Sequence, residues 1–200
     1  MWFLNKSTIY LFNSPDFEKP KPELEQYSTP PDIAFEIIKK VNSAGNLSGK
    51  IADLGSGTGR LSIAAAILGA EVTGFEIDEE AINIAKEYSR RENLDIKWIT
   101  KPIEAIEEEF NTVIMNPPFG SQRPGADRIF LEKAMSIAKN IWTIHLSETR
   151  KFIEKTVENN NCQIIELYGF DYPLKKSMPF HSKESRSENA ILYHIASLPK

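Results

Sequence analysis

Apolar residues recur along this chain in two alternating patterns. Short runs rich in isoleucine, valine and leucine are typical of buried strands. Between them lie longer segments in which apolar residues return every three or four positions, as they do on one face of a helix. The short runs predict strands at 50–55, 71–77, 95–100, 111–116, 141–146, 162–170 and 189–197, and the longer segments predict helices at 32–41, 60–69, 78–93, 128–140 and 147–160.

This alternation with short connections predicts an α/β fold. We expect a single doubly wound, mostly parallel seven-stranded sheet with helices on both faces. The last two strands have no helix between them, so they are expected to form an antiparallel hairpin at one edge, joined by a polar, basic loop at 171–188. Prolines and charges at 13–31 predict an extended arm. Asp32 and Asp78 are the expected N-caps of their helices.

The bulk composition narrows the class of protein. Two hundred residues, of which 41% are hydrophobic, suit one globular domain with a substantial core. A net charge of −4 argues against a broadly basic nucleic-acid coat but allows a local basic patch. Cys162, the only cysteine, is expected in the core, and with three scattered histidines we expect no metal site. Without a signal peptide or an apolar stretch of about 18 residues, we expect a cytoplasmic protein that does not enter a membrane.

The stretch DLGSGTGRL places three glycines between the first predicted strand and the helix that follows it. In an open α/β sheet this turn borders the ligand crevice, and glycines let the backbone approach a ligand closely. The dinucleotide fingerprint would need glycine where Arg60 stands. With an aspartate before the first glycine, the pattern instead resembles the cofactor loop of Rossmann-type S-adenosylmethionine (SAM) methyltransferases. The loop residues expected to bind SAM are Asp53, Gly55, Ser56, Gly57 and Gly59.

Glu76 ends the next predicted strand, about 20 residues further on, where a carboxylate can accept both ribose hydroxyls. Its neighbour Ile77 is assigned to the same cofactor site. Methyltransferases often carry an aspartate for the adenine amino group after the third strand, but this chain has Lys-Pro at 101–102. Either the backbone near Ile103 or the side chain of Glu104 would then read the adenine edge.

The fourth predicted strand runs directly into Asn-Pro-Pro-Phe. Prolines cannot continue a sheet, so the strand should deliver Asn116 to its carboxyl edge. An amine conjugated to a ring, such as N6 of adenine, is a poor nucleophile, and acceptors on its two N–H bonds stabilise it as it becomes tetrahedral. The Asn116 oxygen and the Pro117 carbonyl would supply that pair. Pro118 would stiffen the turn and Phe119 would stack on the base. A rigid turn without catalytic function is the alternative.

Several motifs together resemble one family, the archaeal and eukaryotic methyltransferases that form N6-methyladenosine in small-subunit ribosomal RNA. The motifs are LEQYSTPPDIA (24–34), DLGSGTGRLSIAAAILGA (53–70), GFEIDEEAI (74–82), TVIMNPPFG (112–120), IHLSETR (144–150), FDYP (170–173) and FHSK (180–183). The resemblance covers residues 24–200, which implies a methyltransferase domain over that range and an N-terminal extension at 1–23.

The resemblance implies SAM as cofactor and ribosomal RNA, or the small ribosomal subunit, as substrate. Gln26, Tyr27 and Thr29 would close over SAM from the arm, and Asn116 would contact both SAM and the target adenine. Eukaryotic members use a small zinc-binding activator subunit, so a similar partner is implied. The candidate RNA-binding residues are Arg123, Arg128, Lys175, Lys176, His181, Lys183 and Arg186. An ordinary solvated loop is the alternative for the basic segment that holds most of them.

Three other functions are compatible with these motifs. Asn-Pro-Pro-aromatic also serves methylation of protein glutamine and of DNA adenine, but both usually need a recognition domain for which 200 residues leave no room. A ribosome-assembly factor could bind SAM and RNA without catalysis. The intact Asn-Pro-Pro-Phe argues against that third reading.

Overall fold

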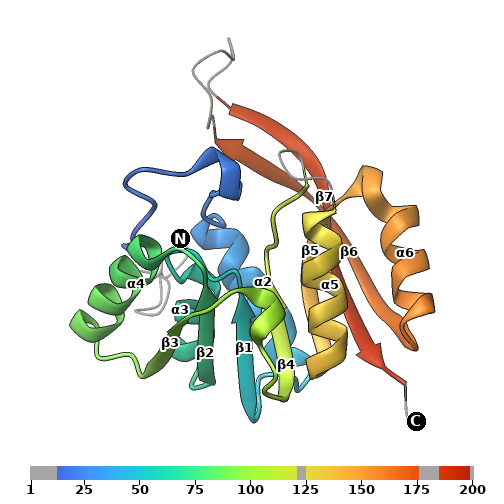
Figure 1. Cartoon of the computed structure of the whole chain (residues 1–200), viewed down its shortest axis with the longest axis horizontal. Coiled ribbons are helices and arrows are strands. Elements are labelled where there is room, and N and C mark those ends of the chain that lie inside the picture. Colours follow the sequence, from blue (N-terminus) through green and yellow to red (C-terminus); the bar gives the residue numbers. More distant parts are fainter. Residues whose placement is uncertain (1–12, 121–124, 176–184, 199–200) are drawn as a thin grey trace, which may run out of the picture.

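The computed structural model describes residues 13–120, 125–175 and 185–198, which form a seven-stranded sheet with helices on both faces (Figure 1). The strands are β1 (Lys50–Leu54), β2 (Glu71–Glu76), β3 (Ile96–Thr100), β4 (Phe110–Met115), β5 (Ala138–Leu146), β6 (Cys162–Lys175) and β7 (Ser185–Ser197). The helices are α2 (Pro31–Ser43), α3 (Arg60–Ile67), α4 (Glu79–Arg91), α5 (Ala126–Ile137) and α6 (Arg150–Asn159), with short 3-10 helices η1 (Pro22–Leu24), η2 (Ile103–Ala105) and η3 (Ser147–Thr149).

The strand order is β3-β2-β1-β4-β5-β7-β6. The first five strands pair in parallel, and β7 lies antiparallel between β5 and β6. The predicted doubly wound, mostly parallel sheet with an antiparallel edge hairpin is therefore confirmed. In the described ranges, no helix has both the length and the apolar character needed to cross a bilayer.

Each face of the sheet carries its own hydrophobic core. Successive side chains of a strand point to opposite faces, so Val113 and Ile114 of β4 belong to different cores. The core containing Ile114 lies under α2, α3 and α4, and the core containing Val113 lies under α5 and α6. Cys162 is buried in the second core, as predicted.

One of the two predicted helix caps is wrong. α2 begins at Pro31 with Pro30 as its N-cap, so Asp32 lies within the first turn. Proline is well tolerated there because the first N–H groups of a helix have no partner inside the helix. Asp78 does cap α4 as predicted, accepting a hydrogen bond from the backbone N–H of Glu80 at 3.1 Å.

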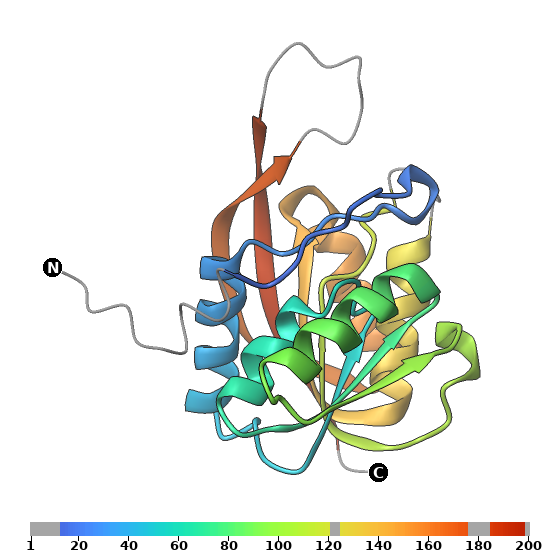
Figure 2. The same ribbon diagram turned by 90° about the vertical axis from the view of Figure 1, so that its left-hand side faces the viewer.

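The C-terminal hairpin is longer than predicted. Its strands were expected to stop at residue 170 and resume at 189, but β6 and β7 stay paired to Lys175 and from Ser185. Figures 1 and 2 show this hairpin rising beyond the carboxyl edge of the sheet. Tyr172, opposite Glu188 of β7, is only 1% exposed, so the buried pattern of the strand continues into a segment whose composition is that of a loop.

Candidate active site

Four consecutive strands deliver their carboxyl ends to one cavity. The glycine loop follows β1, Glu76 ends β2, residues 101–104 follow β3 and Asn116 follows β4. The ends of β1 and β2 are level because Leu54 pairs with Phe75 in parallel register. The predicted site residues that line the cavity are Gln26, Tyr27, Thr29, Asp53, Gly55, Ser56, Gly57, Glu76, Ile77, Ile103, Asn116 and Pro118. The structure therefore brings most of the predicted site together.

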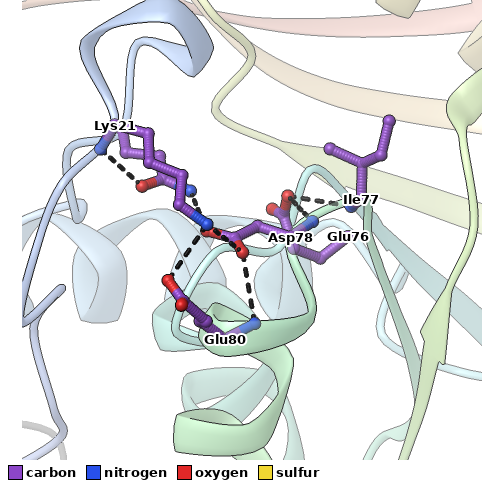
Figure 3. A network of polar contacts seen from close by, with 6 residues as sticks. Lys21, Glu76, Ile77, Asp78 and Glu80 are labelled. Atoms are coloured by element: carbon purple, nitrogen blue, oxygen red, sulfur yellow. Dashed lines mark hydrogen bonds and ion pairs between the residues drawn. The ribbon is translucent and has the colours of Figure 1, made fainter.

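Glu76 ties the glycine loop to the end of β2. One carboxylate oxygen accepts the Gly57 N–H at 2.8 Å. The other accepts the N–H groups of Ile77 at 2.8 Å and Asp78 at 3.0 Å (Figure 3). Burial raises the pKa of Glu76, and these three N–H donors oppose that rise. A carboxylate has about four acceptor positions, so Glu76 can still accept from a ligand.

All three glycines of the loop adopt backbone angles that favour glycine, and Gly57 and Gly59 show two different reasons for it. Gly57 has φ of 54°, and a Cβ there would lie 2.8 Å from the ring of Phe17. Gly59 has φ of 91°, and a Cβ there would collide with Trp98 of β3. Gly59 is absent from the residues that line the cavity. A glycine is needed at position 59 because the loop packs closely on Trp98 of β3. The sequence had assigned Gly59 to the cofactor instead.

The adenine end of the predicted cofactor site contains both alternatives for recognition. Ile103 and Glu104, in η2, both line the cavity together with Lys101. Ile77, which also lines the cavity, is 55% exposed although it is a large hydrophobic residue. An exposed isoleucine beside a cavity offers an apolar surface for a planar ring.

Asp53 is fully buried at the end of β1 and braces the start of α3. Its Oδ2 accepts hydrogen bonds from the Ser62 backbone N–H at 3.0 Å and the Ser62 hydroxyl at 2.7 Å. Burial raises the pKa of Asp53 to about 7, although both Ser62 contacts lower it. Asp53 therefore lines the cavity and also stabilises the start of α3 through its Oδ2 atom.

Asp53 should give stability an unusual pH dependence. Its pKa is about 7 when folded and 3.8 in the reference state, so the folded protein binds the proton more tightly. The Asp53 contribution to unfolding free energy should therefore fall as pH rises from about 4 to about 7, by at most about 1.4 kcal/mol per pH unit. Urea unfolding of wild type and Asp53→Asn at pH 5 and pH 7.5 measures it, because the difference cancels other titrating groups. A difference that is the same at both pH values would contradict the assignment.

Asn116 leaves β4 with its amide nitrogen bonded and its oxygen unpartnered. The nitrogen Nδ2 donates to the Thr29 hydroxyl at 3.0 Å and to the Tyr172 hydroxyl at 2.9 Å. The oxygen Oδ1 is buried and has no hydrogen-bond partner within the described part of the chain. Buried acceptors are nearly always paired in native proteins, so this one suits an N–H donor from a ligand.

Tyr27 covers the Asn-Pro-Pro-Phe turn. Its hydroxyl donates to the Pro117 carbonyl at 3.1 Å, and its ring lies 5.1 Å from that of Phe119. Phe119 also packs edge-on against Tyr172 at 5.9 Å, and neither Pro117 nor Phe119 lines the cavity. The resemblance assigns Tyr27 to SAM. In the structure, its hydroxyl instead contacts the Pro117 carbonyl and its ring contacts Phe119, the two groups that we expect to hold the target base.

An unpredicted residue, Arg60, holds the arm over the cavity. The arm, residues 13–30, crosses the carboxyl edge of the sheet in Figure 2. Arg60 is 7% exposed and donates to the Ser14 hydroxyl, the Ser14 carbonyl, the Pro15 carbonyl and the Thr29 carbonyl at 2.9–3.1 Å. Its rigid fork of N–H groups suits several carbonyls at once. The one sequence signal was a charged residue opening a helix that is otherwise apolar.

A second clasp fixes the arm to the start of α4. Gln26 accepts the Lys21 backbone N–H at 2.8 Å and donates to Asp78 at 2.7 Å. The Lys21 ammonium group contacts Asp78 at 2.7 Å and Glu80 at 3.0 Å (Figure 3). The amide oxygen and the amide nitrogen of Gln26 are thus both hydrogen-bonded within the protein. Gln26 therefore lines the cavity and also holds the arm in place.

Replacing Arg60 by methionine should release the arm. The change keeps the apolar stem and removes four hydrogen bonds to residues 14–29. We expect faster chymotryptic cleavage after Phe17 or Tyr27 of the arm and about tenfold weaker SAM binding, since about 1.4 kcal/mol is tenfold. Mass spectrometry of the digest and calorimetric titration measure the two effects. Arg91→Met, which removes an exposed ion pair with Glu92, is the control. Equal cleavage rates and equal SAM affinities in the two variants would show that Arg60 does not hold the arm.

The predicted RNA-binding residues are only partly described. Arg128 is exposed in the first turn of α5 and pairs with Glu132 at 2.8 Å. Lys175 and Arg186 belong to the paired ends of β6 and β7. The remaining candidates, Arg123, Lys176, His181 and Lys183, lie outside the described residues. RNA binding by this set stays a prediction.

Known proteins resemble this chain over most of its length. The Methyltransferase small domain family matches residues 32–142. The Danio rerio rRNA N(6)-adenosine-methyltransferase METTL5 is 37% identical over 179 residues, covering 84% of this chain and 86% of its own. An uncharacterised Methanocaldococcus jannaschii protein is 36% identical over 193 residues, covering 90% and 87%. The crystal structure of PH1948 from Pyrococcus horikoshii, a candidate RNA methyltransferase, gives a TM-score of 0.91 at 33% identity and covers 98% of this chain and all of its own.

The family match contains the whole core of the site. The glycine loop, Glu76 and Asn-Pro-Pro-Phe all fall between residues 32 and 142. The chain therefore belongs to the family of SAM-dependent methyltransferases that includes METTL5.

Proposed function

We propose that this protein transfers a methyl group from SAM to N6 of an adenine in ribosomal RNA, specifically that of the small subunit. The observation that carries the proposal is the buried Asn116 oxygen, which has no hydrogen-bond partner in the described structure and belongs to a residue lining the cavity. The relatives named as rRNA N6-adenosine methyltransferases support the choice of substrate.

The residues around the cavity fit SAM. Glu76 has acceptor capacity left for a ribose hydroxyl, and the exposed Ile77 with Ile103 would flank the adenine. The Ser56 hydroxyl has no hydrogen-bond partner among the described residues and is available to a ligand. When bound, SAM supplies a methyl group activated by its sulfonium.

The chain's own residues would hold the amine that receives this methyl group. The Asn116 oxygen and the Pro117 carbonyl accept its two N–H bonds, which stabilises the positive charge that develops on nitrogen. Positioning then supplies much of the catalysis, and no strong general base is needed because the methylated amine loses its proton readily. Since Tyr27 now donates to the Pro117 carbonyl and packs on Phe119, the target base would have to take its place.

The basic segment that follows β6 is the proposed contact with the RNA backbone, because cationic side chains bind phosphates. A zinc-binding activator subunit and a cytoplasmic location stay predictions from the resemblance and the sequence. Neither is needed for the chemistry assigned to Asn116 and Pro117.

Incubation with labelled SAM and either ribosomal RNA or small subunits, followed by nucleoside analysis, tests the proposal. We expect label in N6-methyladenosine. Label on protein with no N6-methyladenosine would contradict it and would favour glutamine methylation. Comparing free RNA with assembled small subunits, each with and without large-subunit RNA as competitor, tests the small-subunit assignment.

A further inference from the structure

Tyr27 stands between the cavity and two of the groups expected to hold the target base. Tyr27, Asn116 and Pro118 line the cavity, whereas Pro117 and Phe119 do not. The Tyr27 ring lies 5.1 Å from the Phe119 ring at an angle of 31°, and the Tyr27 hydroxyl donates to the Pro117 carbonyl at 3.1 Å. A base in the cavity therefore cannot stack on Phe119 while the Tyr27 ring is there.

The contacts of Tyr27 are of the two kinds that the proposed function assigns to the target adenine. Its hydroxyl donates a hydrogen bond to the Pro117 carbonyl, as one N–H of the adenine amine would. Its ring packs on Phe119, as the base would. A carbonyl oxygen has two acceptor positions, so the ring, more than the hydrogen bond, excludes the base. The hydrogen bond holds the ring in this position.

The backbone on both sides of Tyr27 is held by other contacts. Gln26 donates to Asp78 at 2.7 Å, and the Thr29 carbonyl accepts from Arg60 at 3.0 Å. These bonds do not involve the Tyr27 side chain. The arm can therefore keep its place beside the cofactor site while the Tyr27 side chain moves to another rotamer.

We infer that Tyr27 is a gate, which occupies the position of the target base in the free protein and turns away before an adenine is methylated. Only molecules with the side chain turned away accept the base, so a mostly closed gate lowers the apparent affinity for RNA in proportion to the open fraction. The inference rests on the proposed function, because it takes the Pro117 carbonyl and Phe119 as groups that hold the adenine.

Tyr27→Phe tests the gate because it keeps the ring and removes the hydrogen bond that holds the ring in place. The net contribution of one such bond corresponds to about a fivefold change in an equilibrium. We therefore expect kcat/KM for the methylated ribosomal RNA to rise about fivefold. The same lost bond should lower the Tm of the free protein by about 2–4 °C. A hydroxyl with only a structural role would lower Tm without raising kcat/KM.

Tyr168→Phe is the matched control. It removes the hydroxyl of a tyrosine on β6, which donates to Glu166 at 2.6 Å, and should leave kcat/KM unchanged. Calorimetry should give a SAM affinity of Tyr27→Phe within about twofold of wild type, which assigns the rise in kcat/KM to the RNA. An unchanged or lowered kcat/KM in folded Tyr27→Phe would overturn the gate.

A second variant, Tyr27→Leu, provides the test if Tyr27→Phe does not fold. It removes the ring together with the hydroxyl, so kcat/KM should rise by at least about fivefold. Wild-type or lower kcat/KM in folded Tyr27→Leu would also overturn the gate. A wild type that makes N6-methyladenosine while neither variant is faster contradicts the gate alone. Label on another acceptor contradicts the proposed function, and the same variants then test the gate with that acceptor.

Discussion

Asn116→Ala is expected to bind SAM as the wild type does and to lose most of its turnover. The side chain supplies the unpartnered buried oxygen that we assign to one N–H of the substrate amine. Loss of one such preorganised group in other enzymes lowers kcat by about 10²–10³-fold. The measurement is single-turnover methylation of ribosomal RNA at saturating SAM, with SAM affinity determined by calorimetry on the same samples.

Asn83→Ala is the matched control, because Asn83 is exposed on α4 and away from the cavity lining. It should turn over at the wild-type rate. Thermal unfolding of Asn116→Ala must also be measured and be close to wild type, so that a loss of turnover is not a loss of folded protein. Wild-type turnover by Asn116→Ala would show that the amine is held by other groups, and the assignment of Asn116 and Pro117 would be wrong.

The framework of the site was predictable because it depends on local sequence patterns. Alternating apolar runs predicted seven strands, and parallel strands place their carboxyl ends at one edge. Glycines after β1, a carboxylate after β2 and Asn-Pro-Pro-Phe after β4 therefore had to meet. Residue spacing alone carried that conclusion, and the cavity lining confirms it for Gly57, Glu76 and Asn116.

The contacts that close the site were not predictable, because they join residues far apart in the chain. Arg60 meets the Ser14 carbonyl across 46 positions, and Tyr172 meets Asn116 across 56. The local sequence around either residue does not show which distant residue it contacts. Tyr172 lies in a polar segment that reads as a loop, and only its pairing within the extended hairpin shows that it is buried.

Glycine illustrates the limit of motif reading. A glycine in such a loop can be needed for a close ligand or for a close side chain, and the sequence is the same in both cases. Gly57 lines the cavity, yet its missing Cβ also makes room for Phe17 of the arm. Gly59 faces Trp98 instead of the cavity. The motif identified the loop correctly, but it could not assign each glycine to the ligand or to the protein.

Glu76→Ala should have the opposite kinetic signature to Asn116→Ala. The substitution removes the acceptor for three backbone N–H groups, those of Gly57, Ile77 and Asp78, together with the group proposed for the ribose. Hydrogen bonds to charged groups contribute about 1.5–3 kcal/mol each, so losing the loop anchor and the ribose acceptor should weaken SAM binding at least about 100-fold. Once SAM saturates the site, kcat should stay within about threefold of wild type because Asn116 and Pro117 are intact.

Glu71→Ala, at the exposed start of the same strand, is the control and should bind SAM normally. The isosteric Glu76→Gln adds a test by pH. Burial raises the pKa of Glu76, so wild-type affinity should decline on acidification sooner than it would for an exposed glutamate, as the ribose acceptor takes up a proton. Glu76→Gln has no such proton to take up and should show a flatter profile at lower affinity. Unchanged SAM affinity in Glu76→Ala would place the ribose elsewhere and leave Glu76 as an anchor for the glycine loop alone.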